Sequence, residues 1–219
     1  MNKNQIHFLI KVGKKKHIEN FRNQGIVFMN SINYFKEMEE DEQRKDIQEG
    51  IEKIEQIKWL KIESDGKEFE FAKNGKKNIL TSAQLRMANP KLEGNIFSMI
   101  AITTELSVKT DKLDERNAEF GDSFLIIFNP KEFLNRIDKA IKKLGFNYEW
   151  NLVRYYDEKT NNGDLNVFFK TSKFEHQNEF RIFVENNEGK PLILNIGSII
   201  DISEISNIAE LKKIRFKLE

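Results

Sequence analysis

Residues 170–184 read Lys-Thr-Ser-Lys-Phe-Glu-His-Gln-Asn-Glu-Phe-Arg-Ile-Phe-Val, and the second half of this stretch alternates between polar and apolar side chains. Successive side chains of a β-strand point to opposite faces of the sheet. We therefore expect a strand at 178–184 that turns Phe180, Ile182 and Val184 toward a core. An amide, a carboxylate and a guanidinium share the other face: Gln177, Glu179 and Arg181.

The composition limits the classes of protein to which the chain can belong. Its 219 residues suit one large domain. Lys and Arg total 36 against 35 Asp and Glu, so a dominant field toward nucleic acid or membrane is not expected. The absence of cysteine excludes disulfides, thiolate catalysis and Cys-ligated zinc. The N-terminus has too short an apolar run for a signal peptide, and no run approaches a membrane span. We expect a cytoplasmic protein with no membrane partner.

The pattern along the chain predicts one α+β domain, residues 1–219, with a mixed or largely antiparallel sheet packed by a few helices. Glu39 to Gly50 is acidic and without clear periodicity, so we expect a mobile loop there. We expect residues 107–121 to form a loop as well. Strands are predicted at 5–12, 26–32, 57–62, 68–71, 96–103, 123–128, 150–156, 165–170, 178–184, 191–196 and 213–218. Helical segments are predicted at 14–24, 33–35, 82–88, 130–144 and 207–212.

The clearest helix signal lies between residues 129 and 145. Asn129 is a good N-cap, Pro130 suits the first helical position and Glu132 can complete a capping box. An apolar stripe with helical spacing follows, and we expect it to pack on the strands at 96–103 and 123–128. Its members are Phe133, Ile137, Ala140, Ile141 and Leu144, before a terminating Gly145.

The polar face of the 178–184 strand is the first candidate site. A carboxylate fixed on a strand can hold a ribose hydroxyl and stabilise an oxocarbenium-like transition state, which makes Glu179 the catalytic candidate. Gln177 can orient an acceptor from the same face. We expect Lys170, Arg181 and Tyr156 to line the same cavity, with the two cations keeping Glu179 ionised. The alternative is that Glu179 forms ordinary ion pairs with Arg181 or Lys170 on a solvated face.

Other residues are candidates for binding a nucleotide. His17 stands behind three lysines near a helix start, a place that favours phosphate. His7 lies in the first predicted strand, and Tyr34 precedes a loop that could close over a ligand. Tyr156, or its neighbour Tyr155, could stack a base or a nicotinamide. For each residue a structural role is the alternative. No metal is expected, because the histidines and acids lack metal-site spacing.

Much of the chain resembles the DUF2971 and abortive-infection-type proteins found among bacterial defence genes. The resemblance implies a role in phage–host conflict, as a toxin or an antiviral defence protein. It is carried by Lys16-His17, Phe21, Gly25, Phe28-Met29-Asn30, Tyr34-Phe35, Glu40, Arg44, Asp46, Glu49-Gly50, Phe97-Ser-Met, Gly121-Asp122, Phe133, Arg136, Tyr155-Tyr156, Phe169-Lys170, 174–181, Ile196-Gly197-Ser198 and Asp201-Ile202.

A more distant similarity is to the ADP-ribosyltransferase superfamily, in which a strand-borne glutamate in a Q/E-x-E tripeptide is catalytic. Gln177-x-Glu179 matches that tripeptide, and His7 occupies a first-strand position that contacts NAD in the superfamily. The resemblance therefore implies NAD as the ligand and a protein or nucleic acid as the acceptor. The chain departs from the pattern in two ways. His7 is followed by Phe8 instead of glycine, and Thr103-Thr104 is a poor substitute for a Ser-Thr-Ser triplet.

Two further hypotheses stay open at the level of sequence. The protein could be a non-enzymatic inhibitor that uses the acidic segment 37–55 to dock on a basic partner or to mimic nucleic acid. It could also bind a phosphorylated nucleotide without reacting with it. The enzyme hypothesis requires His7, Gln177, Glu179 and a tyrosine around one concave pocket. The inhibitor hypothesis requires a contiguous exposed patch instead.

Overall fold

The computed structural model describes residues 2–37, 51–73, 78–89 and 92–216. The acidic loop predicted at Glu39 to Gly50 lies outside the described residues. The chain forms an α+β fold with antiparallel sheets packed by a few helices, as predicted. No helix in the described ranges is long and apolar enough to cross a membrane.

The main sheet has the strand order β14-β2-β7-β1-β8-β15, with β13 paired to β7 and β9 paired to β13. Every pairing in it is antiparallel. Its strands are β1 (Ile6–Gly13), β2 (Ile26–Ser31), β7 (Asn95–Thr103), β8 (Ser123–Ile127), β9 (Tyr148–Leu152), β13 (Glu179–Val184), β14 (Leu192–Asn195) and β15 (Ser203–Asn207). These strands include most of those predicted from alternation.

The sheet divides along one edge of β7. β13 pairs with β7 from Asn95 to Ile100 on one edge. On the other edge, β2 pairs only at Asn95 and Ile96, whereas β1 pairs from Ile100 to Thr103. The two strands therefore diverge and leave the middle of β7, around Ser98, without a strand beside it on this edge. The main cavity of the protein lies at this gap.

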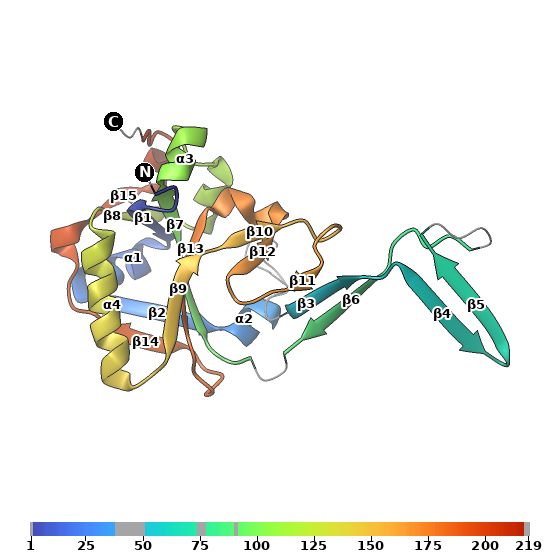
Figure 1. Cartoon of the computed structure of the whole chain (residues 1–219). Coiled ribbons are helices and arrows are strands. Elements are labelled where there is room, and N and C mark those ends of the chain that lie inside the picture. Colours follow the sequence, from blue (N-terminus) through green and yellow to red (C-terminus); the bar gives the residue numbers. More distant parts are fainter. Residues whose placement is uncertain (1, 38–50, 74–77, 90–91, 217–219) are drawn as a thin grey trace.

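Two helices cover the sheet face that carries the largest apolar cluster. They are α1 (Lys15–Gln24) and α4 (Pro130–Leu144). The Asn129 side chain accepts the backbone N–H of Glu132 at 3.1 Å, and Gly145 ends α4 in the left-handed conformation, as predicted. Phe133 is fully buried in this cluster, as are Ile137 and Ile141. Leu144 was expected in the stripe but is half exposed, because α4 extends beyond the sheet at its last turn (Figure 1).

The opposite face is covered by shorter elements. They are α3 (Thr104–Lys109), the 3-10 helix η1 (Glu115–Phe120) and α5 (Ile208–Leu211). A second apolar cluster fills this layer and includes Ile10, Ile102 and Phe124 from the sheet. Smaller elements complete the described fold: α2 (Ile32–Glu37), β10 (Arg154–Tyr156), β11 (Gly163–Asp164), β12 (Phe169–Thr171), and the 3-10 helices η2 (Ser172–Gln177) and η3 (Ile200–Ile202).

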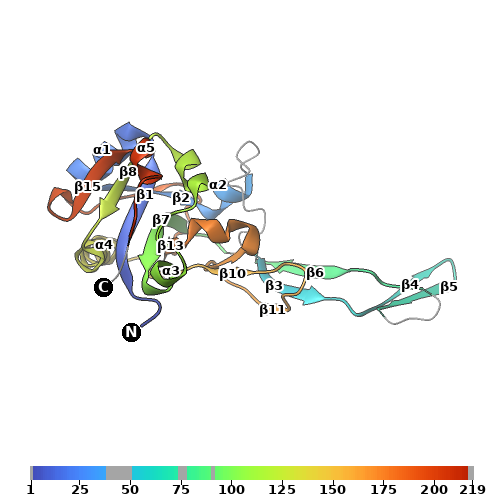
Figure 2. The same cartoon turned by 90° about the horizontal axis from the view of Figure 1, so that it is seen from above.

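A long two-stranded arm projects away from this body (Figures 1 and 2). Its base is built from β3 (Ile51–Gln56) and β6 (Gln84–Ala88), and its far part from β4 (Trp59–Ser64) and β5 (Lys67–Ala72). The turn between β4 and β5 is Asp65-Gly66, and both residues have positive φ angles, of 52° and 71°. This hairpin agrees with the prediction, since two positive φ values match the twist of the flanking strands.

Several predicted elements are wrong. The helix expected at 82–88 is wrong: residues 84–88 form strand β6, whose backbone pairs antiparallel with β3, and no local pattern reveals this pairing. The loop expected at 107–121 contains the end of α3 and all of η1. The Thr103 side chain caps the start of α3, and the Asp114 side chain caps the start of η1. Val153 divides the strand expected at 150–156 into β9 and β10, and the strand expected at 165–170 is reduced to β12.

The strand expected at the C-terminus is also absent from residues 213–216. These residues follow α5 as irregular chain, and the backbone N–H of Phe216 donates to the Asp111 carbonyl at 2.9 Å. The edge position of the sheet is taken by β15, which pairs with β8. Residues 217–219 lie outside the described ranges.

Candidate functional site

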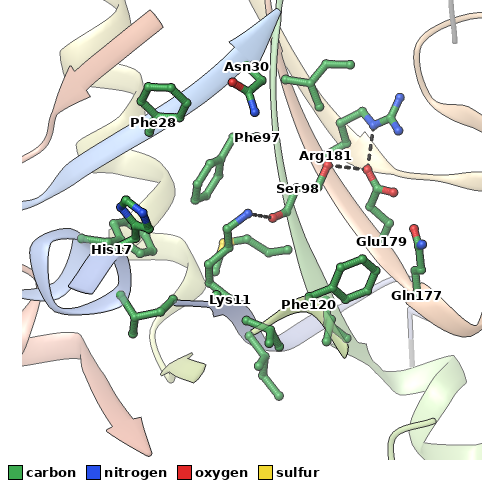
Figure 3. A pocket seen from close by; sticks show the side chains of 18 of the residues that line it. Lys11, His17, Phe28, Asn30, Phe97, Ser98, Phe120, Gln177, Glu179 and Arg181 are labelled. Atoms are coloured by element: carbon green, nitrogen blue, oxygen red, sulfur yellow. Dashed lines mark hydrogen bonds and ion pairs between the residues drawn. The ribbon is translucent and has the colours of Figure 1, made fainter. Parts of the chain in front are cut away.

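A cavity of about 590 Å³ lies where β1 and β2 diverge from β7. Residues of α1, β1, β2, β7 and β13 line it, so segments far apart in sequence meet there (Figure 3). Its walls are largely apolar, with a small number of polar side chains between them. This composition is typical of small-molecule sites, and the volume lies in their usual range.

The carboxylate of Glu179 is the centre of a buried polar cluster at one end of the cavity. Its Oε1 accepts hydrogen bonds from Ser98 Oγ at 2.5 Å and from Arg181 Nε at 2.8 Å. Its Oε2 accepts a hydrogen bond from Lys170 Nζ at 2.7 Å. Lys170 also donates to Gln177 Oε1 at 3.0 Å. The structure thus brings together four of the five residues predicted to share this cavity, all but Tyr156, and adds Ser98.

The elements around the cluster explain how it forms. Lys170 lies on β12, and Gln177 is the last residue of η2 instead of part of the strand. Asn178 then adopts a left-handed conformation, with φ of 42°, and turns the chain into β13. The backbone N–H of Glu179 donates to the Tyr155 hydroxyl at 2.9 Å, which fixes the first residue of β13 against β10.

The cluster is buried, which the alternation did not predict. Glu179 is 4% exposed and Arg181 is 2% exposed. Burial alone raises the pKa of Glu179, but the charges of Arg181 and Lys170 outweigh burial and hold the pKa well below its usual range. Glu179 is therefore ionised, as expected. The ion pairs of the alternative, from Glu179 to Arg181 and to Lys170, are present. The solvated face that it assumed is wrong, since Phe183 and neighbouring apolar side chains cover the same side of β13.

Ser98 and Lys11 are the site residues that the sequence pattern missed. The Lys11 ammonium donates to the Ser98 carbonyl at 2.6 Å, across the gap between β1 and β2, and lies 4.3 Å from the centre of the Phe97 ring. The available signal was that Ser98 is a single polar residue inside the apolar run of β7. Thr103, which in the sequence is only a poor substitute for part of a Ser-Thr-Ser triplet, caps α3.

The remaining predicted site residues separate into two groups. His17 of α1 and Tyr34 of α2 line the same cavity. His17 lies at the end away from Glu179 (Figure 3). His7 and Tyr156 are not among the described residues of its lining. His7 Nε2 instead lies 2.9 Å from Thr104 Oγ1, so His7 does not share the pocket with Gln177 and Glu179 as the enzyme hypothesis required. Tyr156 is buried with Ile54 and Leu165 under the base of the arm, so the expectation that it lines this cavity is wrong.

The described lining of the cavity has more positively than negatively charged side chains. Among the described residues that line it, Lys11, Lys14, Lys170 and Arg181 are cationic and Glu179 is the one carboxylate. This arrangement favours a ligand that carries negative charge. The described residues contain no group of three or more His, Asp or Glu side chains that could hold a metal ion.

Comparison with protein-family models, with curated proteins and with solved structures found no match to this chain.

Proposed function

We propose that the protein binds an NAD-like dinucleotide in the main cavity and transfers ADP-ribose from it. Resemblance to the ADP-ribosyltransferase superfamily motivates the proposal, and resemblance to abortive-infection-type proteins would place the activity in phage–host conflict. One observation carries it: an ionised Glu179, two residues after Gln177, is fixed at the end of a cavity of about 590 Å³. A carboxylate held in this way suits stabilising positive charge that develops on a ribose.

The cavity has features suited to both parts of a nucleotide. Lys11 and Lys14 supply ammonium groups that can contact phosphate oxygens. Phe28 and Tyr34, which are 51% and 44% exposed, offer aromatic surface for a base. Phe28 lies at the end of the cavity away from Glu179, and Lys11 lies between the two, at the Ser98 carbonyl (Figure 3). A dinucleotide placed in this direction would bring its second ribose to the carboxylate.

The reaction proposed is substitution at the ribose carbon attached to nicotinamide. The glycosidic C–N bond breaks, and its electron pair leaves with nicotinamide as a neutral base. An acceptor hydroxyl, amine or water forms the new bond to that carbon with its lone pair and releases a proton to solvent. Glu179 would accept a hydrogen bond from a ribose hydroxyl and stabilise the oxocarbenium-like transition state. The Gln177 amide would orient the acceptor.

The test is to incubate the purified protein with NAD labelled in its adenylate part and with cell lysate. Release of nicotinamide and transfer of label to macromolecules are measured separately. Glu179→Asp is the informative variant, because it keeps the charge near Lys170 and Arg181 but withdraws the carboxylate from the cavity. A shift of about 1 Å in a catalytic group can cost roughly 100-fold in rate. Glu204→Asp, at an exposed position on β15, is the matched control.

Each outcome separates the hypotheses. Loss of nicotinamide release in a Glu179→Asp variant that is still folded at the assay temperature, with unchanged activity of Glu204→Asp, supports the proposal. Saturable binding of NAD with no release of nicotinamide indicates that the protein binds the nucleotide without reaction. Absence of NAD binding, measured by calorimetry on folded protein, refutes the proposed ligand.

A further inference from the structure

A second cavity, of about 440 Å³, lies beside strand β9 on the side of the sheet that carries Phe183. It is separate from the main cavity and plays no part in the proposed function. The segment 165–168 and the base of the arm form its other walls. Two features of this groove are independent of each other: an open strand edge, and a described lining with carboxylates but no cationic side chain.

The first feature is the direction of the backbone groups of β9. Asn147 accepts the N–H of Glu185 at 2.9 Å, and Val153 donates to the Glu179 carbonyl at 2.8 Å. Odd-numbered residues here therefore bond inward to β13, and the backbone groups of Tyr148 and Trp150 point outward. In the described part of the chain β13 is the only strand paired with β9.

No strand among the described residues occupies the position next to that edge. Further along the chain, in β10, the backbone N–H of Arg154 also points away from β13 and donates to the Phe168 carbonyl at 2.8 Å. β12 then runs parallel to β10 in that position. Before β12 the chain turns away, because Leu165 donates to the Glu52 carbonyl at 2.6 Å. The groove occupies the space that a strand beside β9 would fill.

The second feature is the charge of the groove. Its described lining contains Glu52, Glu149 and Glu185 and no cationic side chain. Two of these carboxylates accept hydrogen bonds from neutral amides: Glu52 from Asn89 at 2.6 Å, and Glu185 from Asn147 at 3.0 Å. Below them the floor is apolar, with Phe168 and Phe183. A methylene stem could lie on this floor with its charged end at the carboxylates.

We propose that the open edge of β9 docks an extended basic peptide segment. The segment adds a strand to the sheet through the outward backbone groups of Tyr148 and Trp150. A Lys or Arg of the segment stands directly across from Glu149, within the roughly 5 Å of cross-strand neighbours. Its aliphatic stem covers Phe183, and its charge meets Glu149 and Glu185. The neighbouring residues of the segment face the opposite side, next to the rings of Tyr148 and Trp150.

The test uses a labelled acetyl-Thr-Val-Lys-Val-Thr-amide peptide and the whole protein, with binding followed by fluorescence anisotropy. One control peptide has norleucine in place of Lys, and a second has N-methyl groups on the two Val nitrogens. The double variant Glu149→Gln with Glu185→Gln is compared with Glu204→Gln on the opposite edge strand β15. All three carboxylates are on exposed residues, so the variants should keep the wild-type melting temperature.

We expect saturable binding that weakens with added salt and is lost with the N-methylated peptide. Removing the charge, in the peptide or in the double variant, should weaken binding by about tenfold or more. Glu204→Gln should leave it unchanged. Hydrogen exchange should slow at the Trp150 amide on binding and stay constant at the Glu204 amide. Equal affinity for the norleucine peptide, or an unaffected double variant, overturns the proposal, as does absence of saturable binding.

Discussion

The ammonium of Lys170 and the carboxylate of Glu179 meet at 2.7 Å inside the protein, with side chains that are 8% and 4% exposed. They come from two strands, β12 and β13, which are joined by the short helix η2. Both residues line the main cavity, and both side chains are buried in the protein interior. Substitutions here are therefore expected to affect stability as well as any activity.

Lys170→Met should lower the free energy of unfolding by about 3–5 kcal/mol, because it leaves part of a buried negative charge uncompensated. Urea denaturation of both proteins measures the difference. Lys142→Met is the matched control, since Lys142 pairs with Asp138 on the surface and is 68% exposed; its effect should be far smaller. Similar effects of the two substitutions would show that the buried pair contributes little.

The same cluster should make stability fall on acidification. The pKa of Glu179 is lower in the folded protein than its unfolded value of about 4.3. The stabilisation is therefore complete above about pH 5 and is lost as the pH falls toward the folded pKa. Urea midpoints measured from pH 7 down to pH 3 check this. The double variant Lys170→Met with Glu179→Gln should have a flatter profile, and parallel profiles would contradict the assignment.

Phe133→Ala should cost about 3–5 kcal/mol, since the ring is fully buried between α4 and the sheet. It packs edge-on against Phe21 with ring centres 5.9 Å apart. Leu144→Ala on the same helix should change stability by less than about 1 kcal/mol, because that side chain is half exposed. Thermal or urea unfolding separates the two, and equal losses would place Leu144 in the core.

Gly25 and Gly145 both end helices with positive φ angles, of 69° and 76°. A Cβ on Gly25 would lie 1.9 Å from the Gly197 carbonyl oxygen, whereas a Cβ on Gly145 meets nothing within 4 Å. Gly145→Ala should therefore cost about 1 kcal/mol, from backbone strain alone. Gly25→Ala should cost clearly more, because the backbone at Gly197 must move. Equal unfolding free energies for the two variants would rule out that close approach.

Local signals in the sequence were sufficient for elements whose stabilising contacts lie nearby in the chain. The helix between Asn129 and Gly145 begins and ends where its caps predict, since a cap acts within one turn. The turn at Asp65-Gly66 was predicted for the same reason. Strand β6 was mistaken for a helix because its identity depends on β3, more than 25 residues earlier in the chain.

By itself the sequence determined which side chains of β13 point together, because the period of a strand is two residues. Only the tertiary structure decided that both faces of β13 are buried, and that Ser98 and Lys11 lie beside the polar one. It also placed Tyr156 and His7 elsewhere. The physical reason is that alternation fixes directions within one strand, whereas the site depends on how β1 and β2 diverge from β7, which long-range pairing determines.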